Sequence, residues 1–172
     1  MKQMRISVRK GDIMHFLEEL SHIFDIVAGE REIDFIVNLE DTEEEVWFSP
    51  SKLERILYNL LSNAFKYTQP GGYVKLSAKL IKEEKGTFVQ ISVKDNGRGI
   101  PKEAQEQIFE SYYQVEKRDH REGFGLGLSL TRSLIHMHKG EIRVESEINK
   151  GSDFIVTLNV SEDAYNPDER SS

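Results

Sequence analysis

Cysteine is absent from the 172 residues, so the chain has neither a disulfide framework nor a thiolate metal site. No run approaches the roughly 18 apolar residues that a membrane-spanning helix requires, and no signal peptide opens the sequence. Hydrophobic residues make up 38% of the chain and charged residues 31%, which indicates one well-hydrated domain with a sizeable core. These features predict a cytoplasmic domain that does not itself enter the membrane.

A basic surface is also missing. The net charge is −7, and the lysines and arginines are scattered, so nucleic acid is not expected as a partner. A small anion is still a possible ligand, because backbone N–H groups, a metal ion and one or two lysines can bind it locally. The five histidines lack the H-x-x-x-H spacing of a metal site. One of them, His138, is expected to be a cap that matches the dipole at a helix C-terminus.

Hydrophobic periodicity predicts the order of the elements. Helices are expected from an N-cap at Asp12 to about Gly29, from Ser49-Pro50 to Tyr67, at 101–109 and at 126–138. Alternating patterns predict strands at 32–39, 73–81, 87–94, 141–147 and 153–160, and a short apolar run predicts another at 46–48. The polar, charged segment 110–123 is expected to be an irregular loop. Residues 1–10 are interpreted as a linker remnant and 161–172 as a disordered tail, which leaves 11–160 as the folded domain.

The segment 95–101 reads DNGRGIP and lies between a predicted strand and a short helix. Gly97 and Gly99 have no Cβ, so the backbone could approach a flat ligand closely. Asp95 would offer a fixed hydrogen-bond acceptor beside that space. The alternative interpretation is a surface turn that closes a strand.

The long helix after Ser49 has a polar edge beside its apolar arc. Asn59, Asn63 and Lys66 fall within roughly 60° of each other on this edge. Two amides and an ammonium group beside a core are unfavourable unless a polar ligand covers them. Amide oxygens suit Mg²⁺ and lysine suits phosphate oxygens, so this edge predicts a metal-bound polyphosphate. A solvated helix edge is the alternative.

Alternating glycines at 123, 125 and 127 lead directly into the last long helix. Consecutive N–H groups at a helix N-terminus favour anions. The pattern is neither the dinucleotide-binding fingerprint nor the P-loop, since no lysine follows it. A flexible hinge is the alternative, and both interpretations hold if a phosphate-binding lid must move.

Taken in this order, the motifs resemble those of bacterial sensor histidine kinases. Residues 59–67 look like the N box of that family, 95–101 like its first glycine box, 108–114 like its F box and 123–127 like its second glycine box. The similarity covers about residues 11–160. The wider superfamily includes DNA gyrase B, MutL and the heat-shock chaperone ATPases. The strand at 46–48 looks most like those of hybrid two-component sensors of Bacteroides-type bacteria.

The resemblance implies an α+β fold, a two-layer α/β sandwich in which a mixed β-sheet packs on three helices (the Bergerat ATP-binding fold). It implies ATP and Mg²⁺ as cofactors, with Asn63 and Asn59 as metal ligands and with Asn59 and Lys66 as catalytic residues. Asp95 would accept from the adenine amine. The other nucleotide-binding residues that the resemblance implies are Lys66, Tyr67, Gly97, Gly99, Ile100, Gly123, Gly125, Leu126, Gly127 and Ser152.

Two departures from the superfamily pattern refine the expected function. Hydrolytic members carry a glutamate where this chain has Asn59, and an amide cannot take a proton from attacking water. This favours phosphoryl transfer, in which catalysis is mostly positioning and charge neutralisation. In addition, none of the five histidines matches the phosphoacceptor box, H-E-[IL]-R-T-P.

The resemblance therefore implies that a histidine-bearing dimerisation domain lies upstream and that a response regulator receives the phosphoryl group. This chain alone would be a monomer unable to complete autophosphorylation, from the cytoplasmic portion of a membrane-anchored sensor. Two alternatives stay open. One is a degenerate ATP-binding module without phosphotransfer, and the other is an ATPase of the gyrase or chaperone type.

Overall fold

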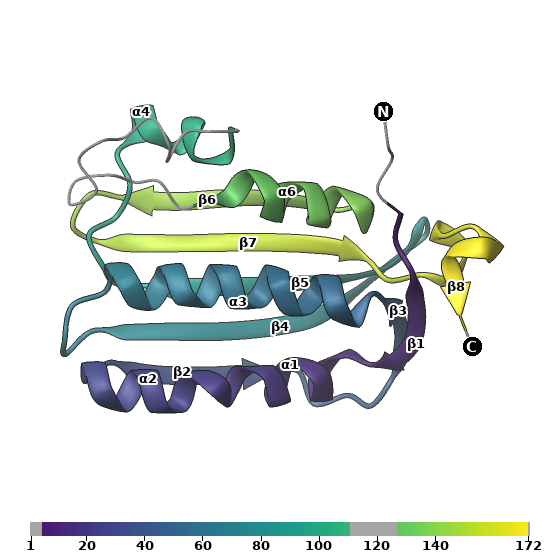
Figure 1. The fold of residues 1–172 in the computed structure, drawn as a ribbon, viewed down its shortest axis with the longest axis horizontal. Helices are drawn as coiled ribbons and strands as arrows, with labels where there is room; N and C mark the ends of the chain where they lie inside the picture. The colour runs from purple at the N-terminus through teal and green to yellow at the C-terminus, as the bar shows by residue number, and fades with distance from the viewer. Residues whose placement is uncertain (1–4, 111–126, 172) are drawn as a thin grey trace.

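The computed structural model describes residues 5–110 and 127–171, which form a helical layer on a mixed five-stranded sheet (Figure 1). The only parallel pair in this sheet, as described, is β2 with β4, and the other neighbours are antiparallel. This architecture confirms the predicted fold class. From edge to edge the strands are β2 (Asp34–Leu39), β4 (Tyr73–Glu83), β5 (Gly86–Asp95), β7 (Gly151–Asn159) and β6 (Glu141–Glu147).

The long helices lie side by side on one face of this sheet (Figure 1). Short helical turns, α4 (Lys102–Gln105) and η1 (Gln107–Phe109), follow β5. The opposite face of the sheet carries half-buried polar side chains such as Ser77, Gln90 and Thr157. The covering helices are α1 (Ile13–Ser21), α2 (Ile23–Arg31), α3 (Pro50–Tyr67) and α6 (Leu128–Met137).

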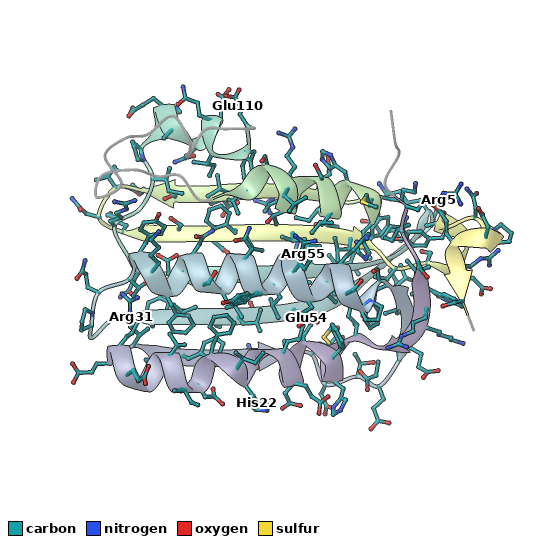
Figure 2. The ribbon with its side chains drawn as sticks, in the orientation of Figure 1. Arg5, His22, Arg31, Glu54, Arg55 and Glu110 are labelled. Carbon is teal, nitrogen blue, oxygen red and sulfur yellow. The ribbon has the colours of Figure 1, made fainter. Side chains whose placement is uncertain are left out.

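Helix α3 lies at the centre of the core. Ser49 caps it by accepting from the N–H of Lys52 at 3.4 Å, and Pro50 occupies the first helical position. Figure 2 shows Glu54 and Arg55 among the side chains of this helix layer, and both are exposed. The apolar arc predicted from the sequence is confirmed, because its seven members are all buried: Leu53, Ile56, Leu57, Leu60, Leu61, Ala64 and Phe65.

The first predicted helix is two helices that meet at His22. Asp12 caps α1 as predicted, accepting from the N–H of His15 at 3.1 Å. Near the end of α1 the Ser21 hydroxyl donates to the carbonyl of Glu18 at 2.6 Å, a local bond that competes with the helical pattern. Helix α2 continues past the end expected near Gly29 to Arg31, and Glu32, at φ 59°, is its left-handed C-cap.

His138 joins the end of α6 to the start of α3. Its Nε2 accepts from the N–H of Ser49 at 3.1 Å, and its Nδ1 lies 3.1 Å from the carbonyl of Leu134. These partners require a neutral ring that carries its proton on Nδ1. Burial is the largest cause that lowers the pKa of His138 to about 4. His138 is the C-cap of α6, as expected, but its neutral ring does not match the helix dipole by charge, and it is a buried structural histidine.

A second, three-stranded sheet corrects both predicted domain boundaries. Strand β1 (Val8–Asp12) pairs antiparallel with β3 (Glu45–Phe48) and parallel with β8 (Arg170–Ser171). The assignment of residues 1–10 as a linker is wrong for the described part, because Ile6 is buried and Val8 lies within β1. Ile6 and Val8 alternate with polar residues, but two apolar residues in a basic segment are too few to predict a strand.

The predicted disordered tail, 161–172, is also ordered over its described residues. Tyr165 is 2% exposed, packs with Ile6 and Val8, and donates its hydroxyl proton to the carbonyl of Asn159 at 2.5 Å. Arg170 pairs with Glu162 at 2.9 Å. A single aromatic residue in a polar segment gives no periodic signal, so the folded unit is wider than the predicted 11–160.

We expect Tyr165→Ala to lower the free energy of unfolding by roughly 3 kcal/mol, because it removes a buried ring from this small cluster. Asp163→Ala, an exposed change two residues away, is the matched control and should have little effect. Urea unfolding measures both. An unchanged midpoint for Tyr165→Ala would contradict the packing of the tail.

Candidate functional site

The N-box edge of α3 and the first glycine box meet at a small cavity beside the end of β5. Its lining includes most of the adenine-side residues expected from the sequence, together with Arg98, which was not expected. The cavity holds about 20 Å³, roughly the room for one water molecule. This volume is smaller than that of a nucleotide base. The lining residues are Asn63, Ala64, Tyr67, Asp95, Arg98, Gly99, Ile100, Ser152 and Phe154.

Asp95 ends the central strand β5, where it is paired with Val74 on one side and Ser152 on the other. It is 6% exposed, and its Oδ1 accepts from the N–H of Gly97 at 2.8 Å. Burial raises the pKa of this carboxyl to about 6, although backbone hydrogen bonds from Gly97 and Ser152 partly oppose the shift. At neutral pH the site therefore offers a buried carboxylate as a hydrogen-bond acceptor.

The two glycines after Asp95 are required by packing within the protein. A Cβ on Gly97 would lie 2.3 Å from the carbonyl oxygen of Tyr67 at the end of α3. A Cβ on Gly99, at φ +74°, would lie 2.1 Å from the carbonyl oxygen of Glu147 in β6. The loop thus fits between a helix end and a strand end, and this contact fixes its position next to Asp95.

Two residues missed by the sequence reasoning hold this loop in place. The hydroxyl of Ser146 accepts from the N–H of Ile100 at 2.8 Å and lies 3.0 Å from the hydroxyl of Ser152. The amide of Gln105 donates to the carbonyls of Ile100 and Ser146 at 2.9 and 3.1 Å. No local pattern marks either residue, because their partners lie on other elements.

Arg98 and Lys66 both lie near the ring of Tyr67. The Arg98 guanidinium carbon is 4.3 Å from the ring centroid, and the Lys66 ammonium is 5.4 Å from it. Cations at these distances are attracted to the face of an aromatic ring. Two positive charges therefore lie near Tyr67, a residue that lines the cavity, and they suit an anionic ligand.

Asn59 lies one turn before Asn63 on α3 and faces α6. Its Nδ2 donates to the carbonyl of Gly127 at 3.2 Å and to the hydroxyl of Thr131. This contact brings the end of the second glycine box against the N box. Gly123, Gly125 and Leu126 lie outside the described residues.

The donor set fits a hard divalent cation such as Mg²⁺. Within 5–110 and 127–171, no group of three or more His, Asp or Glu side chains could hold a metal ion. The oxygen donors at the N box are amides, which Mg²⁺ accepts alongside phosphate oxygens and water. Because the NH₂ group of Asn59 is directed to α6, its Oδ1 is the atom that can serve as a ligand.

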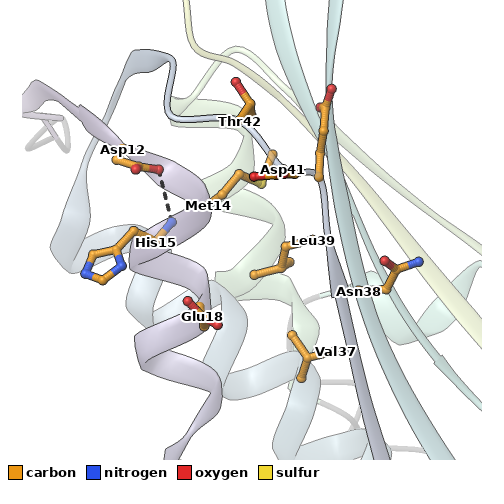
Figure 3. A pocket seen from close by; sticks show the side chains of 10 residues that line it. Asp12, Met14, His15, Glu18, Val37, Asn38, Leu39, Asp41 and Thr42 are labelled. Atoms are coloured by element: carbon orange, nitrogen blue, oxygen red, sulfur yellow. Dashed lines mark hydrogen bonds between the residues drawn. The ribbon is translucent and has the colours of Figure 1, made fainter.

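A larger hollow of about 440 Å³ lies between the start of α1 and the end of β2 (Figure 3). Carboxylates dominate its polar lining, including Glu18, Glu40 and Asp41, and would repel a polyphosphate. Asp12 is also occupied there as the cap of α1, as the dashed line in Figure 3 shows. The smaller cavity at Asp95, where the N box meets the first glycine box, is the candidate nucleotide site.

Residues 48–162 match the family model described as histidine kinase-, DNA gyrase B- and HSP90-like ATPase. The chain belongs to this family. The matched range contains the N box, both glycine boxes and the candidate site. No helix in the described part of the chain is long and apolar enough to cross a membrane.

Among curated proteins, the chain is similar to the adaptive-response sensory kinase SasA of Synechococcus sp. (strain JA-2-3B'a(2-13)). The two are 39% identical over 134 residues, which are 78% of this chain and 34% of that protein. Similarity to the sensor histidine kinase WalK of Bacillus subtilis is 35% over 153 residues, or 88% of this chain and 24% of WalK. The chain thus spans about a third or less of the length of these relatives.

Solved histidine kinase structures share the fold. The catalytic domain of histidine kinase ThkA superposes with a TM-score of 0.77 at 25% identity, covering 93% of this chain and all of that one. Full-length ShkA in complex with AMPPNP gives a TM-score of 0.79 at 27% identity, covering 93% of this chain and 32% of ShkA. These comparisons confirm the resemblance to histidine kinase catalytic domains.

We expect Gly97→Ala to destabilise the domain by roughly 2 kcal/mol, because the new methyl group must displace the carbonyl of Tyr67. Gly29→Ala is the matched control, since nothing lies within 4 Å of a Cβ there and alanine favours the helix. Thermal unfolding compares the two. Equal stability of Gly97→Ala and the parent chain would rule out the close contact.

Proposed function

We propose that this chain is the catalytic, ATP-binding domain of a sensor histidine kinase. It would transfer the γ-phosphoryl group of Mg-ATP to a histidine on a dimerisation domain as part of two-component signal transduction. The observation that carries this proposal is that the site contains both a buried carboxylate, Asp95, and an N-box amide, Asn59. Hydrolytic members of the superfamily carry glutamate at the position of Asn59. Membership of the ATPase family and the sensor kinases among its relatives support it.

In this proposal different residues of the site contact the adenine, the sugar and the phosphates of the nucleotide. Asp95 accepts from the exocyclic amine of adenine, with Gly97, Gly99, Ile100 and Ser152 around the ring. Tyr67 contacts the sugar, and Lys66 binds phosphate oxygens. The glycine-rich segment formed by Gly123, Gly125, Leu126 and Gly127 surrounds the triphosphate, where N–H groups favour anions.

The metal site completes the proposed mechanism. Asn63 and Asn59 present amide oxygens to Mg²⁺, which supplies charge neutralisation at the transferring phosphoryl group when bound. Asn59 cannot act as a base, so the acceptor histidine, and not water, is the proposed nucleophile. Lys66 stabilises the negative charge on the phosphoryl oxygens.

The proposed setting is the cytoplasmic portion of a membrane-anchored sensor, with an upstream histidine-bearing domain and a response regulator as partners. The described domain on its own is proposed to be a monomer. The assignment to a hybrid sensor, based on the strand at 46–48, stays a prediction.

Calorimetric titration with a non-hydrolysable ATP analogue, with and without Mg²⁺, tests the proposal. We expect one site per chain and tighter binding in the presence of the metal. In a second experiment, ATP and a histidine-bearing dimerisation domain are added to the chain, and we expect that domain to be phosphorylated. Sustained phosphate release without that domain would instead indicate an ATPase of the gyrase or chaperone type. Binding without transfer would indicate a degenerate ATP-binding module.

Asp95→Ala should weaken ATP-analogue binding by about 1–3 kcal/mol, since the adenine amine loses its acceptor.

In the parent chain, the affinity for the ATP analogue should fall as the pH drops through about 6, where the Asp95 carboxylate becomes protonated. Stability should change in the opposite direction. The folded-state pKa is raised above 3.8, so the stabilising contribution of protonation is complete below pH 3.8 and is lost as the pH rises through 6.

Asp95→Asn serves as the control, because it cannot titrate and should flatten both pH dependences. Titration calorimetry and urea unfolding between pH 5 and 8 measure them. An unchanged affinity of Asp95→Ala for the ATP analogue would show that adenine binds elsewhere.

Asn63→Ala should weaken binding of the ATP analogue mainly when Mg²⁺ is present, because it removes one proposed metal ligand. Glu54→Ala, an exposed change on the same helix, should leave both affinities unchanged. Equal losses with and without Mg²⁺ in Asn63→Ala would move the metal site away from this residue.

A further inference from the structure

Thr131 is a buried polar residue on α6 for which the motif comparison assigns no role. It is 2% exposed, and its hydroxyl accepts a hydrogen bond from the Nδ2 of Asn59. The same Nδ2 donates to the carbonyl of Gly127 at 3.2 Å. Residues four apart lie on the same face of a helix, so Gly127 and Thr131 present two acceptors side by side to a single amide.

The carbonyl of Gly127 determines which way the Asn59 amide faces, and the Thr131 hydroxyl strengthens that orientation by accepting from the same NH₂ group. An asparagine side chain has a donor NH₂ group and an acceptor oxygen of nearly the same size, and a half turn of the amide exchanges them. With both N–H bonds given to α6, the oxygen is directed away from that helix. The reversed orientation would set the amide oxygen against the carbonyl of Gly127, which can only accept, and would turn the NH₂ group toward a cation.

A hydroxyl at position 131 is otherwise unfavourable. The neighbouring buried residues of α6 are apolar, as at Leu128, Leu134 and Ile135, and a valine would fill nearly the same volume as Thr131. Burying a hydroxyl without a partner is costly. The partner that the described residues supply is Asn59, 72 residues away in sequence.

We propose that Thr131 is a positioning residue for the metal–nucleotide site. Its hydroxyl, together with the carbonyl of Gly127, holds the Asn59 amide in the orientation that presents Oδ1 to the divalent cation. The inference rests on the proposed function in one respect, which is that Asn59 ligates the metal. It adds that the ligand is oriented by the helix that follows the second glycine box.

The test compares Thr131→Val, which removes the acceptor, with Thr131→Ser, which keeps it. Each is titrated with a non-hydrolysable ATP analogue in Mg²⁺ and in EDTA. We expect Thr131→Val to lose about tenfold in affinity in Mg²⁺ and little in EDTA, whereas Thr131→Ser resembles the parent chain. Ser133→Ala is the matched control, because that hydroxyl is exposed on α6 and bonds to the carbonyl of Ser129.

A second readout does not depend on the nucleotide. The side-chain amide signals of Asn59 in a ¹H–¹⁵N spectrum of the metal-free protein should shift in Thr131→Val and be restored in Thr131→Ser. Unchanged Asn59 signals in Thr131→Val would overturn the hydrogen bond and the proposal with it. Thr131→Ala replaces the valine variant if the latter does not fold.

The outcomes separate this inference from the proposed function. Absence of metal-dependent binding in the parent chain would contradict the proposed function. Metal-dependent binding in the parent chain with equal affinities in Thr131→Val would overturn the positioning role alone. An equal loss in Mg²⁺ and EDTA that Thr131→Ser does not rescue would also overturn it, because it would show a general packing effect.

Discussion

The burial of one carboxylate constrains the arrangement of the whole candidate site. Asp95 ends the central strand of the sheet, and burial raises its pKa to about 6. The protein offsets the desolvation of this group with backbone N–H donors, one of which comes from the loop that follows it. To bring that backbone close, the loop must lie against the end of α3, and β7 must begin beside it. Gly97 and Gly151 meet this requirement, since a Cβ on Gly151 would lie 2.0 Å from the carbonyl oxygen of Asp95.

Helix α3 connects the two halves of the site through residues one turn apart. Asn63 lines the cavity at Asp95, whereas Asn59 bonds to Gly127 and Thr131 at the start of α6. The apolar arc of the same helix is anchored in the core, where Phe65 stacks on Phe24 with ring centroids 5.6 Å apart. The polar edge therefore has little freedom to move. Any rearrangement of the start of α6 therefore changes the hydrogen bonds of the Asn59 amide, while α3 itself stays in place.

The sequence was informative wherever structure depends on local pattern. The apolar arc of α3, its cap at Ser49 and the alternation of β4 and β5 follow from neighbouring residues, and the structure agrees with them. Pairings between distant segments left no such signal. Ser146 meets Ile100 across 46 residues and Thr131 meets Asn59 across 72, and each is an ordinary polar residue in its own segment. The isolated Tyr165 and the basic strand β1 were missed for the same reason.

The parallel pairing of β1 with β8 places Val8 beside Arg170 and Arg9 beside Ser171. The first and last described strands of the domain are therefore neighbours in space. A short peptide could connect these two places, and the exposed turn at Glu84 and Lys85, between β4 and β5, could be opened instead. Such a circular permutant would change the order in which the strands are synthesised while every strand kept its neighbours. The order of the strands in each sheet is thus defined by their pairings in space and not by their order along the chain.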